Sequence, residues 1–305
     1  MPLPKIIVIL GPTASGKTDL GLVLAKKFNG EIVSADSRQV YKTMDIGTAK
    51  PVGEWEKERK VYIVDGIPHH LIDVVDPKKD FSLADYKALA TKSIETILSR
   101  KKLPLVVGGT GLYIQALVEN LDIPKVEPDK HLRAQLEKKK LSELAAMLEK
   151  IDPDTAEKID LKNPRRVLRA LEVVIQSGES IFKQQTKSNP IYEALQIGID
   201  LPRAELYERI NSRVDGQIAE GLVEETKKLS KKYKWSLPSM SGIGYKQIGF
   251  YLRGEMTLSQ AVEVLKRDTR RYAKRQMTWA ARDKKIIWIK NIDSAAVEKM
   301  IKEFL

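Results

Sequence analysis

Short, continuous apolar runs recur along the chain and predict buried strands. The runs that we assign to strands are Ile6–Leu10, Glu31–Ala35, Leu103–Val107, Leu195–Ile199 and Ile286–Ile289. Several of them are followed by stretches in which apolar residues recur every three or four positions, as in amphipathic helices. Examples of this spacing are Leu20, Val23, Leu24 and Phe28, and then Leu83, Tyr86, Leu89 and Ile97. Strands that alternate with helices predict an α/β fold with a parallel sheet.

The pattern changes between residues 124 and 190, where strand-like runs vanish and helical spacing takes over. Within this stretch, Asn163 and Pro164 form a typical helix start, and Gly178 is a typical helix stop. We therefore predict an α/β core formed by residues 1–123 and 191–305, with C-terminal helices. An all-helical domain, residues 124–190, is inserted between its two parts.

A second long helical pattern lies near the C-terminus. Its apolar and aromatic positions alternate by three and four residues, through Val262, Leu265, Thr269, Tyr272, Gln276 and Trp279. This spacing is typical of a packing stripe. We therefore expect Tyr272 and Trp279 to lie in the core, and not to form a platform for stacked bases.

The composition is that of a globular protein with a negatively charged partner. Of the 305 residues, 42% are hydrophobic and 31% are charged, and the formal net charge is +12. No apolar run reaches the roughly 18 residues of a membrane span. The absence of cysteine excludes disulfides, cysteine nucleophiles and thiolate metal sites. We expect a cytoplasmic protein that does not bind membranes and whose partner is a polyanion, although scattered lysines also fit a solubilising surface.

A phosphate-binding loop lies between the first predicted strand and the first predicted helix. The residues that match its pattern are Gly11, Pro12, Thr13, Ala14, Ser15, Gly16, Lys17 and Thr18. In this setting backbone N–H groups and a helix N-terminus hold a polyphosphate, Lys17 adds a positive charge, and the Thr18 hydroxyl is suited to bind Mg²⁺. The core is therefore predicted to be P-loop NTPase-like. The loop does not tell which molecule carries the phosphates.

Two further polar residues follow predicted strands. Asp36 comes directly after Glu31–Ala35, and Thr110 follows Gly108 and Gly109 at the end of another strand. Ligands of open α/β sheets bind beyond the carboxyl ends of the strands, so both residues are expected at the edge that carries the phosphate loop. The alternative for Asp36 is a purely structural role as the cap of a turn.

Three other features resemble functional sites less closely. Asp65 follows a strand-like run, as the metal-binding aspartate of nucleotide hydrolases does, but Gly66 and Pro68 follow at once and we interpret it as a decoy. The pair His69 and His70 has no third ligand at a useful spacing, so packing or hydrogen bonding is expected. The run Leu71–Asp73 after them predicts another short strand.

Arginines gather on two of the predicted helices. Arg165, Arg166 and Arg169 lie three and four residues apart and share one side of a helix, with only Glu172 as a nearby acid. On the late helix, a basic band contains Arg267, Arg271, Lys274, Arg275 and Arg282. Such bands are typical of contacts with a nucleic-acid backbone, and a solvated helix face is the alternative.

Motifs spread over nearly the whole chain resemble the tRNA dimethylallyltransferase (tRNA isopentenyltransferase) family. In family order they are Gly11–Thr18, Asp36–Tyr41, Met44–Pro51, Pro68–Asp73, Gly108–Tyr113, Asn163–Arg166, Gly242–Gln247 and Arg270–Trp279. The resemblance implies transfer of a dimethylallyl group from dimethylallyl diphosphate to N6 of adenosine 37 in tRNA. It also implies that the loop holds the donor's diphosphate with Mg²⁺, and that the enzyme is a monomer.

The resemblance further implies roles for individual residues. Asp36 matches the general base, Thr110 matches a residue at the junction of donor and acceptor, and Lys17 belongs to the catalytic set. Residues matching contacts with the tRNA anticodon stem-loop are Asp36, Ser37, Arg38, Gln39, Thr110, Arg133, Arg165, Arg166, Val167, Leu168, Arg169, Ser241, Gly242, Ile243, Gly244, Tyr245, Lys246, Lys274, Arg275 and Gln276.

Three other functions fit parts of the sequence. A P-loop kinase would bind ATP in the same loop, but only Asp65 is offered as its metal-binding aspartate. An adenylate prenyltransferase would share the loop and Asp36 without needing the arginines. An RNA-binding NTPase switch would need the arginines, but not Asp36 and Thr110 at one sheet edge.

Overall fold

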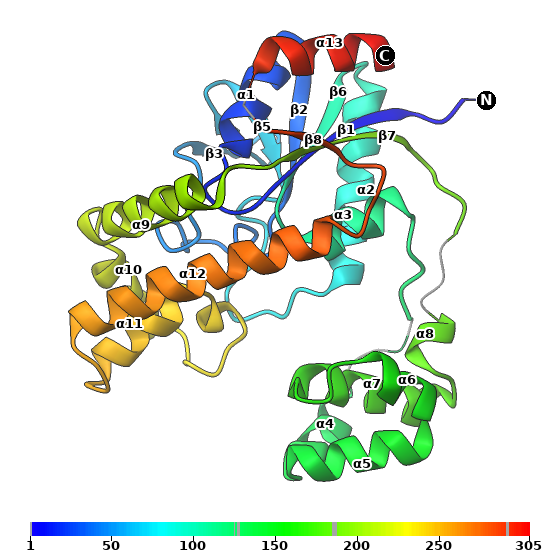
Figure 1. Ribbon diagram of the computed structural model, residues 1–305, viewed down its shortest axis with the longest axis vertical. Helices are drawn as coiled ribbons and strands as arrows, with labels where there is room; N and C mark the ends of the chain where they lie inside the picture. The colour runs from blue at the N-terminus through cyan, green and yellow to red at the C-terminus, as the bar shows by residue number, and fades with distance from the viewer. Residues whose placement is uncertain (1, 125, 127–128, 185–187, 291–292) are drawn as a thin grey trace. The chain divides into compact units, whose positions relative to one another are not determined.

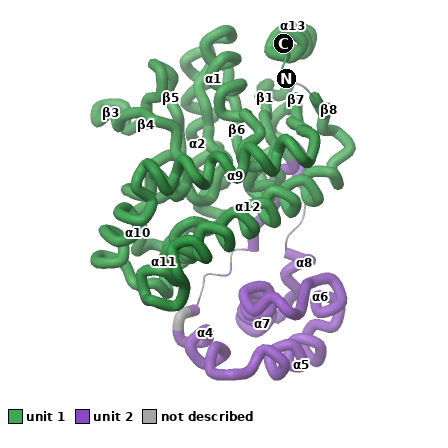
Figure 2. The backbone as a smooth tube through the Cα atoms, turned by 60° about the vertical axis from the view of Figure 1, so that its left-hand side comes forward, with its two compact units in different colours: residues 1–118, 191–305 green, residues 119–190 purple. Residues whose placement is uncertain are grey.

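A computed structural model describes residues 2–124, 126, 129–184, 188–290 and 293–305. The chain forms two compact units, which we call the core unit (Met1–Val118 with Ile191–Leu305) and the helical unit (Glu119–Pro190) (Figure 2). The helical unit begins at Glu119, a few residues before the expected boundary at 124. None of the described helices is both long and apolar enough to cross a membrane.

The core unit is built on one eight-stranded sheet with the strand order β3-β4-β5-β2-β6-β1-β7-β8 (Figure 1). The strands are β1 (Lys5–Leu10), β2 (Gly30–Ala35), β3 (Glu54–Glu56), β4 (Val61–Val64), β5 (Ile67–His70), β6 (Leu103–Gly108), β7 (Glu193–Ile199) and β8 (Ile287–Ile289). From β5 to β8 every neighbouring pair is parallel. This confirms the predicted α/β class with a parallel sheet.

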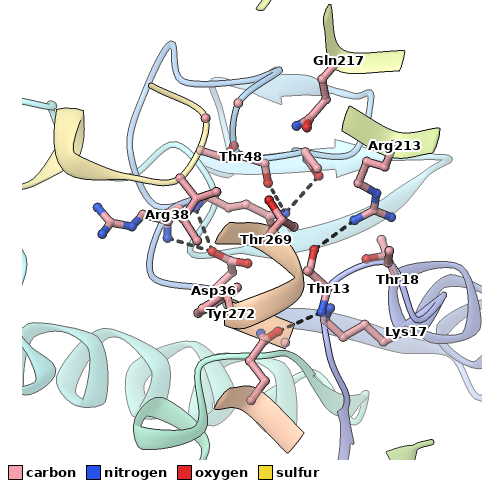
Figure 3. A pocket seen from close by; sticks show the side chains of 18 of the residues that line it. Thr13, Lys17, Thr18, Asp36, Arg38, Thr48, Arg213, Gln217, Thr269 and Tyr272 are labelled. Carbon is pink, nitrogen blue, oxygen red and sulfur yellow. Dashed lines mark hydrogen bonds between the residues drawn. The ribbon is translucent and has the colours of Figure 1, made fainter. Parts of the chain in front are cut away.

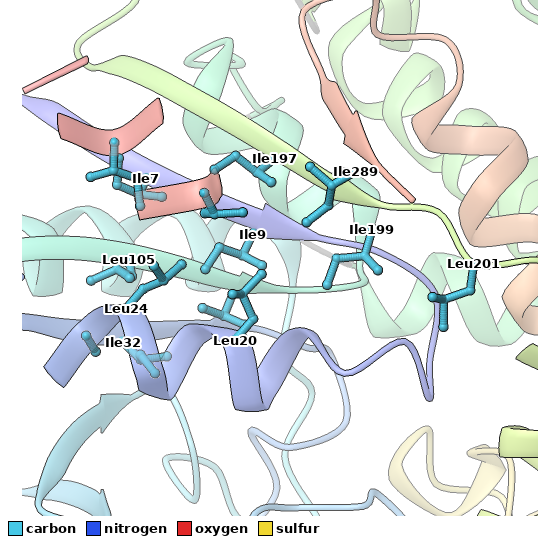
Figure 4. Packing of buried hydrophobic residues seen from close by; sticks show 14 of the residues in the cluster. Ile7, Ile9, Leu20, Leu24, Ile32, Leu105, Ile197, Ile199, Leu201 and Ile289 are labelled. Atoms are coloured by element: carbon cyan, nitrogen blue, oxygen red, sulfur yellow. The ribbon is translucent and has the colours of Figure 1, made fainter. Parts of the chain in front are cut away.

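Helices cover both faces of this sheet. Those of the core unit are α1 (Lys17–Lys27), α2 (Leu83–Ser99), α3 (Gly111–Val118), α9 (Arg203–Ala219), α10 (Leu222–Ser230), α11 (Tyr245–Leu252), α12 (Leu258–Ala280) and α13 (Ser294–Phe304). Alternate residues of β1 point to opposite faces. Ile7 and Ile9 pack with α1 (Figure 4), and Ile6 and Val8 pack in the cluster formed by α2 and α3. Burying one such side chain contributes about 1.5–3 kcal/mol.

A third cluster in the core unit fixes the loops that follow β2. Val40 and Met44 are buried against Tyr245 of α11 and Leu265 of α12. The segment after β2 is therefore anchored by helices that come some 200 residues later in the chain. This anchoring matters because the same segment borders the cavity described below.

The helical unit has a core of its own. Its helices are α4 (Lys130–Leu136), α5 (Leu141–Ile151), α6 (Pro153–Lys158), α7 (Pro164–Ser177) and α8 (Ile181–Gln184). As predicted, the Asn163 side chain caps α7 by accepting a hydrogen bond from the Arg166 N–H, 3.3 Å away. Gly178 ends the helix with φ of 71°, a left-handed conformation that favours glycine.

The structure differs from several local predictions at one edge of the sheet. Strands β3, β4 and β5 pair antiparallel, so the sheet is mixed. Leu71–Asp73 is not a strand; Leu71 and Asp73 have φ of 64° and 56°, which interrupt extended backbone. Asp65, interpreted as a decoy, follows an antiparallel strand and forms an exposed ion pair with Lys26. Helix α13, which the sequence analysis did not anticipate, packs through Val297 and Ile301 on the α1 face.

Two apolar positions of the predicted helical stripes are also exposed. Val23 on α1 and Leu89 on α2 are 47% and 40% accessible, whereas Gly21 and Ala90 are buried. Small residues can face the sheet directly because they allow close approach of helix and strand. The hydrophobic pattern alone therefore placed the buried face of each helix only approximately.

Candidate active site

A cavity of about 520 Å³ opens at the carboxyl ends of the central strands, entirely within the core unit. Its walls come from the phosphate loop, the turn after β2, the segment 47–51, helix α9, the segment before α11, and helix α12. Asp36 and Tyr272 lie on one side, and Lys17, Thr18 and Arg213 on the other (Figure 3). The parallel strands therefore gather the loop and the acidic residue around one space, as the sequence predicted.

The phosphate loop has the backbone geometry needed for anion binding. Ala14 and Gly16 have φ of 64° and 85°, and helix α1 begins at Lys17 directly after this turn. The left-handed residues turn the chain so that successive N–H groups point to one side. The Ser15 hydroxyl is fully buried and has no hydrogen-bond partner among the described residues. The loop residues that line the cavity are Thr13, Ala14, Gly16, Lys17 and Thr18.

Positive charge is concentrated beside the loop. Desolvation lowers the pKa of Lys17 to about 8, while Asp36 opposes this shift and Arg213 adds to it. Arg213 on α9 donates a hydrogen bond from Nη1 to the Thr13 hydroxyl at 3.3 Å. Desolvation also lowers the pKa of Arg213, but a guanidinium stays charged at neutral pH. Lys17 and Arg213 repel each other, and an anion bound between them would relieve that repulsion.

Asp36 and Thr110 meet because their strands are neighbours in register. Ala35 of β2 pairs with Gly108 of β6, so the residues after the two strands emerge side by side. Thr110 Oγ1 accepts a hydrogen bond from the Ser37 N–H at 3.1 Å. Asp36 Oδ1 accepts from the N–H of Arg38 at 2.8 Å and, more weakly, from the next N–H at 3.4 Å. Asp36 thus caps a turn and also lines the cavity, so the two roles considered for it coexist.

Helix α12 contributes more to the cavity than the sequence indicated. Leu265, Thr269, Tyr272 and Gln276 line it. The prediction that Tyr272 lies in the core is therefore wrong, although Trp279, one turn beyond Gln276, does pack inside. Burial, with a contribution from Asp36, raises the pKa of the Tyr272 phenol to about 12, and a hydrogen bond with Thr110 partly opposes the rise. Tyr272 therefore faces the cavity as a neutral phenol.

Charged side chains that range from buried to exposed hold the segment after β2 over the cavity. Both oxygens of the Glu225 carboxylate accept backbone hydrogen bonds, from Asp45 and Ile46 at 3.0 and 2.9 Å and from Gly47 at 3.0 Å. The Tyr245 hydroxyl donates to the same carboxylate at 2.7 Å. Lys50, buried, bridges the carboxylates of Asp45 and Asp73. None of these fixing contacts was foreseen from the sequence.

The predicted contacts of the segment 241–246 occupy different environments. Ser241, Ile243 and Gly244 line the cavity. Tyr245 is buried, with its hydroxyl bound to Glu225, so its side chain is not presented to a partner. Lys246 is exposed on α11. Gly242 is buried close to the guanidinium of Arg38, which donates to the Pro238 carbonyl at 2.8 Å.

The residues of α12 that were predicted to contact tRNA also differ in their surroundings. Lys274 is exposed, and Arg275 is exposed at the rim of the cavity. Gln276 has both ends of its amide bound within the protein, to Thr13 of the phosphate loop and to Gly109 after β6. The Gln39 amide is likewise used inside the core unit, where it donates to the Ala49 carbonyl at 3.2 Å.

The remaining predicted residues belong to the helical unit. Arg165 and Arg166 are exposed on α7, Leu168 is half-buried, and Val167 is fully buried in the unit's core, so that the Val167 side chain is not available to RNA. Arg133 and Arg169 both bind Glu172, whose carboxylate is completely buried, at 2.8 and 2.7 Å. These two arginines therefore neutralise an internal acid, a structural use that the sequence analysis missed.

The histidine pair takes part in hydrogen bonds, as expected. His69 Nδ1 lies 2.9 Å from the Ile67 carbonyl, and His70 Nε2 lies 2.8 Å from the buried Glu31 carboxylate. Within the described residues, no three His, Cys, Asp or Glu side chains cluster as a metal site. A metal ion in the cavity would therefore need most of its ligands from a bound molecule and water.

The chain is similar to several known proteins. A family model described as IPP transferase matches residues 39–283. A protein of Acetivibrio thermocellus named tRNA dimethylallyltransferase is 49% identical over 98% of this chain and 96% of its own length. A protein of the same name from Pelotomaculum thermopropionicum is 46% identical over 98% of this chain and 94% of its own.

Solved structures are similar over nearly the whole chain. The full-length tRNA isopentenylpyrophosphate transferase of Bacillus halodurans gives a TM-score of 0.70 at 42% identity, covering 98% of this chain and 95% of that one. A eukaryotic dimethylallyltransferase acting on tRNA gives 0.73 at 31% identity, covering 91% and 70%. The chain belongs to the IPP transferase family.

Proposed function

We propose that the protein transfers the dimethylallyl group of dimethylallyl diphosphate to N6 of adenosine 37 in the anticodon stem-loop of tRNA, and releases diphosphate. The observation that carries this proposal is that one cavity is lined by the phosphate loop on one side and by Asp36 on the other, with Thr110 bound to the backbone of the neighbouring Ser37. Relatives named tRNA dimethylallyltransferase support the choice of both substrates. The proposal describes a cytoplasmic, monomeric enzyme.

The donor's diphosphate would lie in the phosphate loop. The N–H groups at the start of α1, Lys17 and Arg213 lie on this side of the cavity and are suited to bind phosphate oxygens. These groups oppose the negative charge that grows on the diphosphate as the allylic C1–O bond breaks. Because they are fixed before the donor binds, they need little rearrangement during the reaction.

Asp36 would act at the acceptor nitrogen. The lone pair of adenine N6 is delocalised, so the nitrogen attacks well only if its proton is removed as the new C–N bond forms. Asp36 Oδ1 is held by the turn, and among the described residues none donates a hydrogen bond to Oδ2. Oδ2 is thus suited to accept the N6 proton, while the electron pair of the broken C–O bond leaves with the diphosphate.

Adenosine must leave its stack to reach this position. Enzymes that modify a base commonly flip it into a pocket. Tyr272, which lines the cavity, would then border the flipped base, and the walls of the cavity would exclude water from the electron-poor allylic carbon.

Magnesium fits this site as a companion of the diphosphate. Mg²⁺ prefers oxygen ligands and is often held by one or two protein groups together with phosphate oxygens and water. Thr18 lines the cavity at the start of α1 and offers such an oxygen. The ion, when bound, would neutralise charge on the leaving diphosphate.

Incubation with labelled dimethylallyl diphosphate separates this function from its rivals. Label should enter tRNA and should not enter AMP, with one diphosphate released for each group transferred. Transfer to AMP would identify an adenylate prenyltransferase. Consumption of ATP, with no label in tRNA, would favour a kinase or an NTPase switch.

A further inference from the structure

Gln276 connects the two halves of the cavity directly. Its Oε1 accepts a hydrogen bond from the backbone N–H of Thr13 in the phosphate loop, at 2.9 Å. Its Nε2 donates to the backbone carbonyl of Gly109, at 2.9 Å. One side chain therefore joins the proposed donor loop to the segment that presents Thr110.

Neighbouring residues of α12 contact the same short segment, residues 109–111. Tyr272, one helical turn earlier, has its phenol close enough to Thr110 for the two side chains to interact. Trp279 packs so tightly on Gly111 that an added Cβ would lie 2.1 Å from its ring, and a Cβ on Gly109 would lie 2.2 Å from Gln276 Nε2. The close approach of the glycines leaves the carbonyl of Gly109 within reach of Gln276, and Thr110 has little freedom to move relative to α12.

We propose that Gln276 is a positioning residue that sets the distance between the phosphate loop and the Asp36–Thr110 pair. The inference rests on the proposed function, because the two halves hold the two reactants only if a donor binds in the loop and an acceptor at Asp36. It assigns Gln276 to the geometry of the reaction, in place of the tRNA contact that the sequence suggested.

The physical basis is that the rate of a displacement reaction depends steeply on how the reacting atoms are aligned. The attacking nitrogen and the allylic carbon must approach to about 3–3.5 Å, and a misplacement of about 1 Å can cost two orders of magnitude in rate. Each half of the cavity binds its reactant through its own groups, such as Lys17 on one side. Loss of the connection should therefore slow the transfer step more than it weakens binding of either reactant.

Two substitutions break the connection in different ways. Gln276→Met keeps the length of the side chain and removes both hydrogen bonds. Gly109→Ala keeps the glutamine at position 276 but adds a methyl group where its Nε2 lies, so the side chain must move away. The matched control is Gln260→Met on the same helix, because Gln260 also accepts a backbone hydrogen bond, from Thr257 at 2.9 Å, far from the cavity at the start of α12.

The assay is a single turnover with saturating donor and tRNA, accompanied by the Kd of each substrate and by the melting temperature. We expect Gln276→Met and Gly109→Ala to slow single-turnover transfer by about 10- to 100-fold, with each Kd within about threefold of wild type. Gln260→Met should lower the melting temperature with little effect on the rate.

Three outcomes would overturn the role of Gln276. An unchanged rate in both site variants would make its hydrogen bonds merely structural. A weaker tRNA affinity with a normal rate at saturation would make it a tRNA contact. An equal loss of rate in Gln260→Met would trace the effect to the stability of α12. A wild-type protein that binds the donor but never labels tRNA would instead overturn the proposed function itself.

Discussion

Lys17 should make donor binding depend on pH just above neutrality. Desolvation lowers its pKa to about 8, with Asp36 opposing and Arg213 assisting the shift. Below this pKa the ammonium is charged and attracts the diphosphate, whereas above it the amine is neutral. The affinity for dimethylallyl diphosphate should therefore fall as the pH rises through about 8.

The size of the effect follows from linkage between proton and donor. A bound diphosphate stabilises the charged ammonium and raises its pKa in the complex, so only the free protein titrates near 8. Above that point the Kd should increase about tenfold for each pH unit, or about 1.4 kcal/mol, until the pKa of the complex is reached. The phosphate groups of the donor complete their own ionisation lower, near pH 6, and do not interfere.

Equilibrium dialysis with labelled donor between pH 7 and 10, at constant ionic strength, measures this dependence. Lys17→Arg is the matched control, because a guanidinium remains charged across the range; its Kd should stay constant. The Kd of Lys17→Ala should also stay constant with pH, but at pH 7 this variant should bind the donor more weakly than wild type does. A wild-type Kd that does not change through pH 8, or a break that persists in Lys17→Arg, would refute the assignment of this charge to donor binding.

Three other predictions concern Asp36, the buried Glu31 of β2, and Arg166 of the helical unit. Asp36→Asn should lower the single-turnover rate by about 10²–10⁴ with tRNA affinity intact; a normal rate with weak tRNA binding would make Asp36 a binding residue. Glu31 is buried, and although burial raises its pKa, hydrogen bonds from His70 and Lys102 and the charge of Arg100 lower it from 4.5 to about 2. A lowered pKa stabilises the fold above 4.5, so about 3 kcal/mol should be lost in acid unfolding between pH 4.5 and 2, and Glu31→Gln should abolish this dependence. Arg166→Ala should flatten the salt dependence of tRNA binding by about one unit without changing the melting temperature; an unchanged slope would make it a solvated residue.

The features that the sequence predicted correctly depend on residues close together in the chain. The apolar run of β1, the glycine loop and the start of α1 are contiguous, and their order is enough to imply their geometry. Asp36 and Thr110 are far apart in sequence, but both directly follow strands. A parallel sheet places such residues at one edge whatever the order of its strands, and the register of Ala35 with Gly108 makes them neighbours.

Tyr272 shows why the opposite wall of the cavity could not be predicted. A stripe of residues at spacings of three and four identifies the inward side of a helix, but a core and a cavity both lie inward. Which turns meet packed side chains and which meet a cavity depends on where α12 crosses the sheet. Leu265, Thr269, Tyr272 and Gln276 line the cavity, whereas Trp279 packs on Gly111.

Arg213 illustrates a different limit of the sequence. It lies on α9, where charged residues alternate with apolar ones as on many surface helices, and no neighbouring residue marks it as part of a phosphate site. Its position beside Thr13 is set only when α9 packs against α12. The same holds for Glu225, which resembles any exposed acid in the sequence but anchors Gly47 and its neighbours over the cavity.

The arginines of α7 give the most instructive case. From the sequence we predicted the same role for Arg166 and Arg169, because both lie on one side of a helix with a single acid nearby. In the structure that acid, Glu172, is buried, and burial would raise its pKa if Arg133 and Arg169 did not lower it. A buried carboxylate without partners is costly, by about 3–5 kcal/mol when a pair is broken, so Arg169 is needed for the fold itself. Loss of Arg169 should therefore lower the melting temperature of the protein. Loss of the exposed Arg166 should leave the melting temperature unchanged and, under the proposed function, should weaken tRNA binding. Measuring both properties on both variants separates the two uses of one residue type.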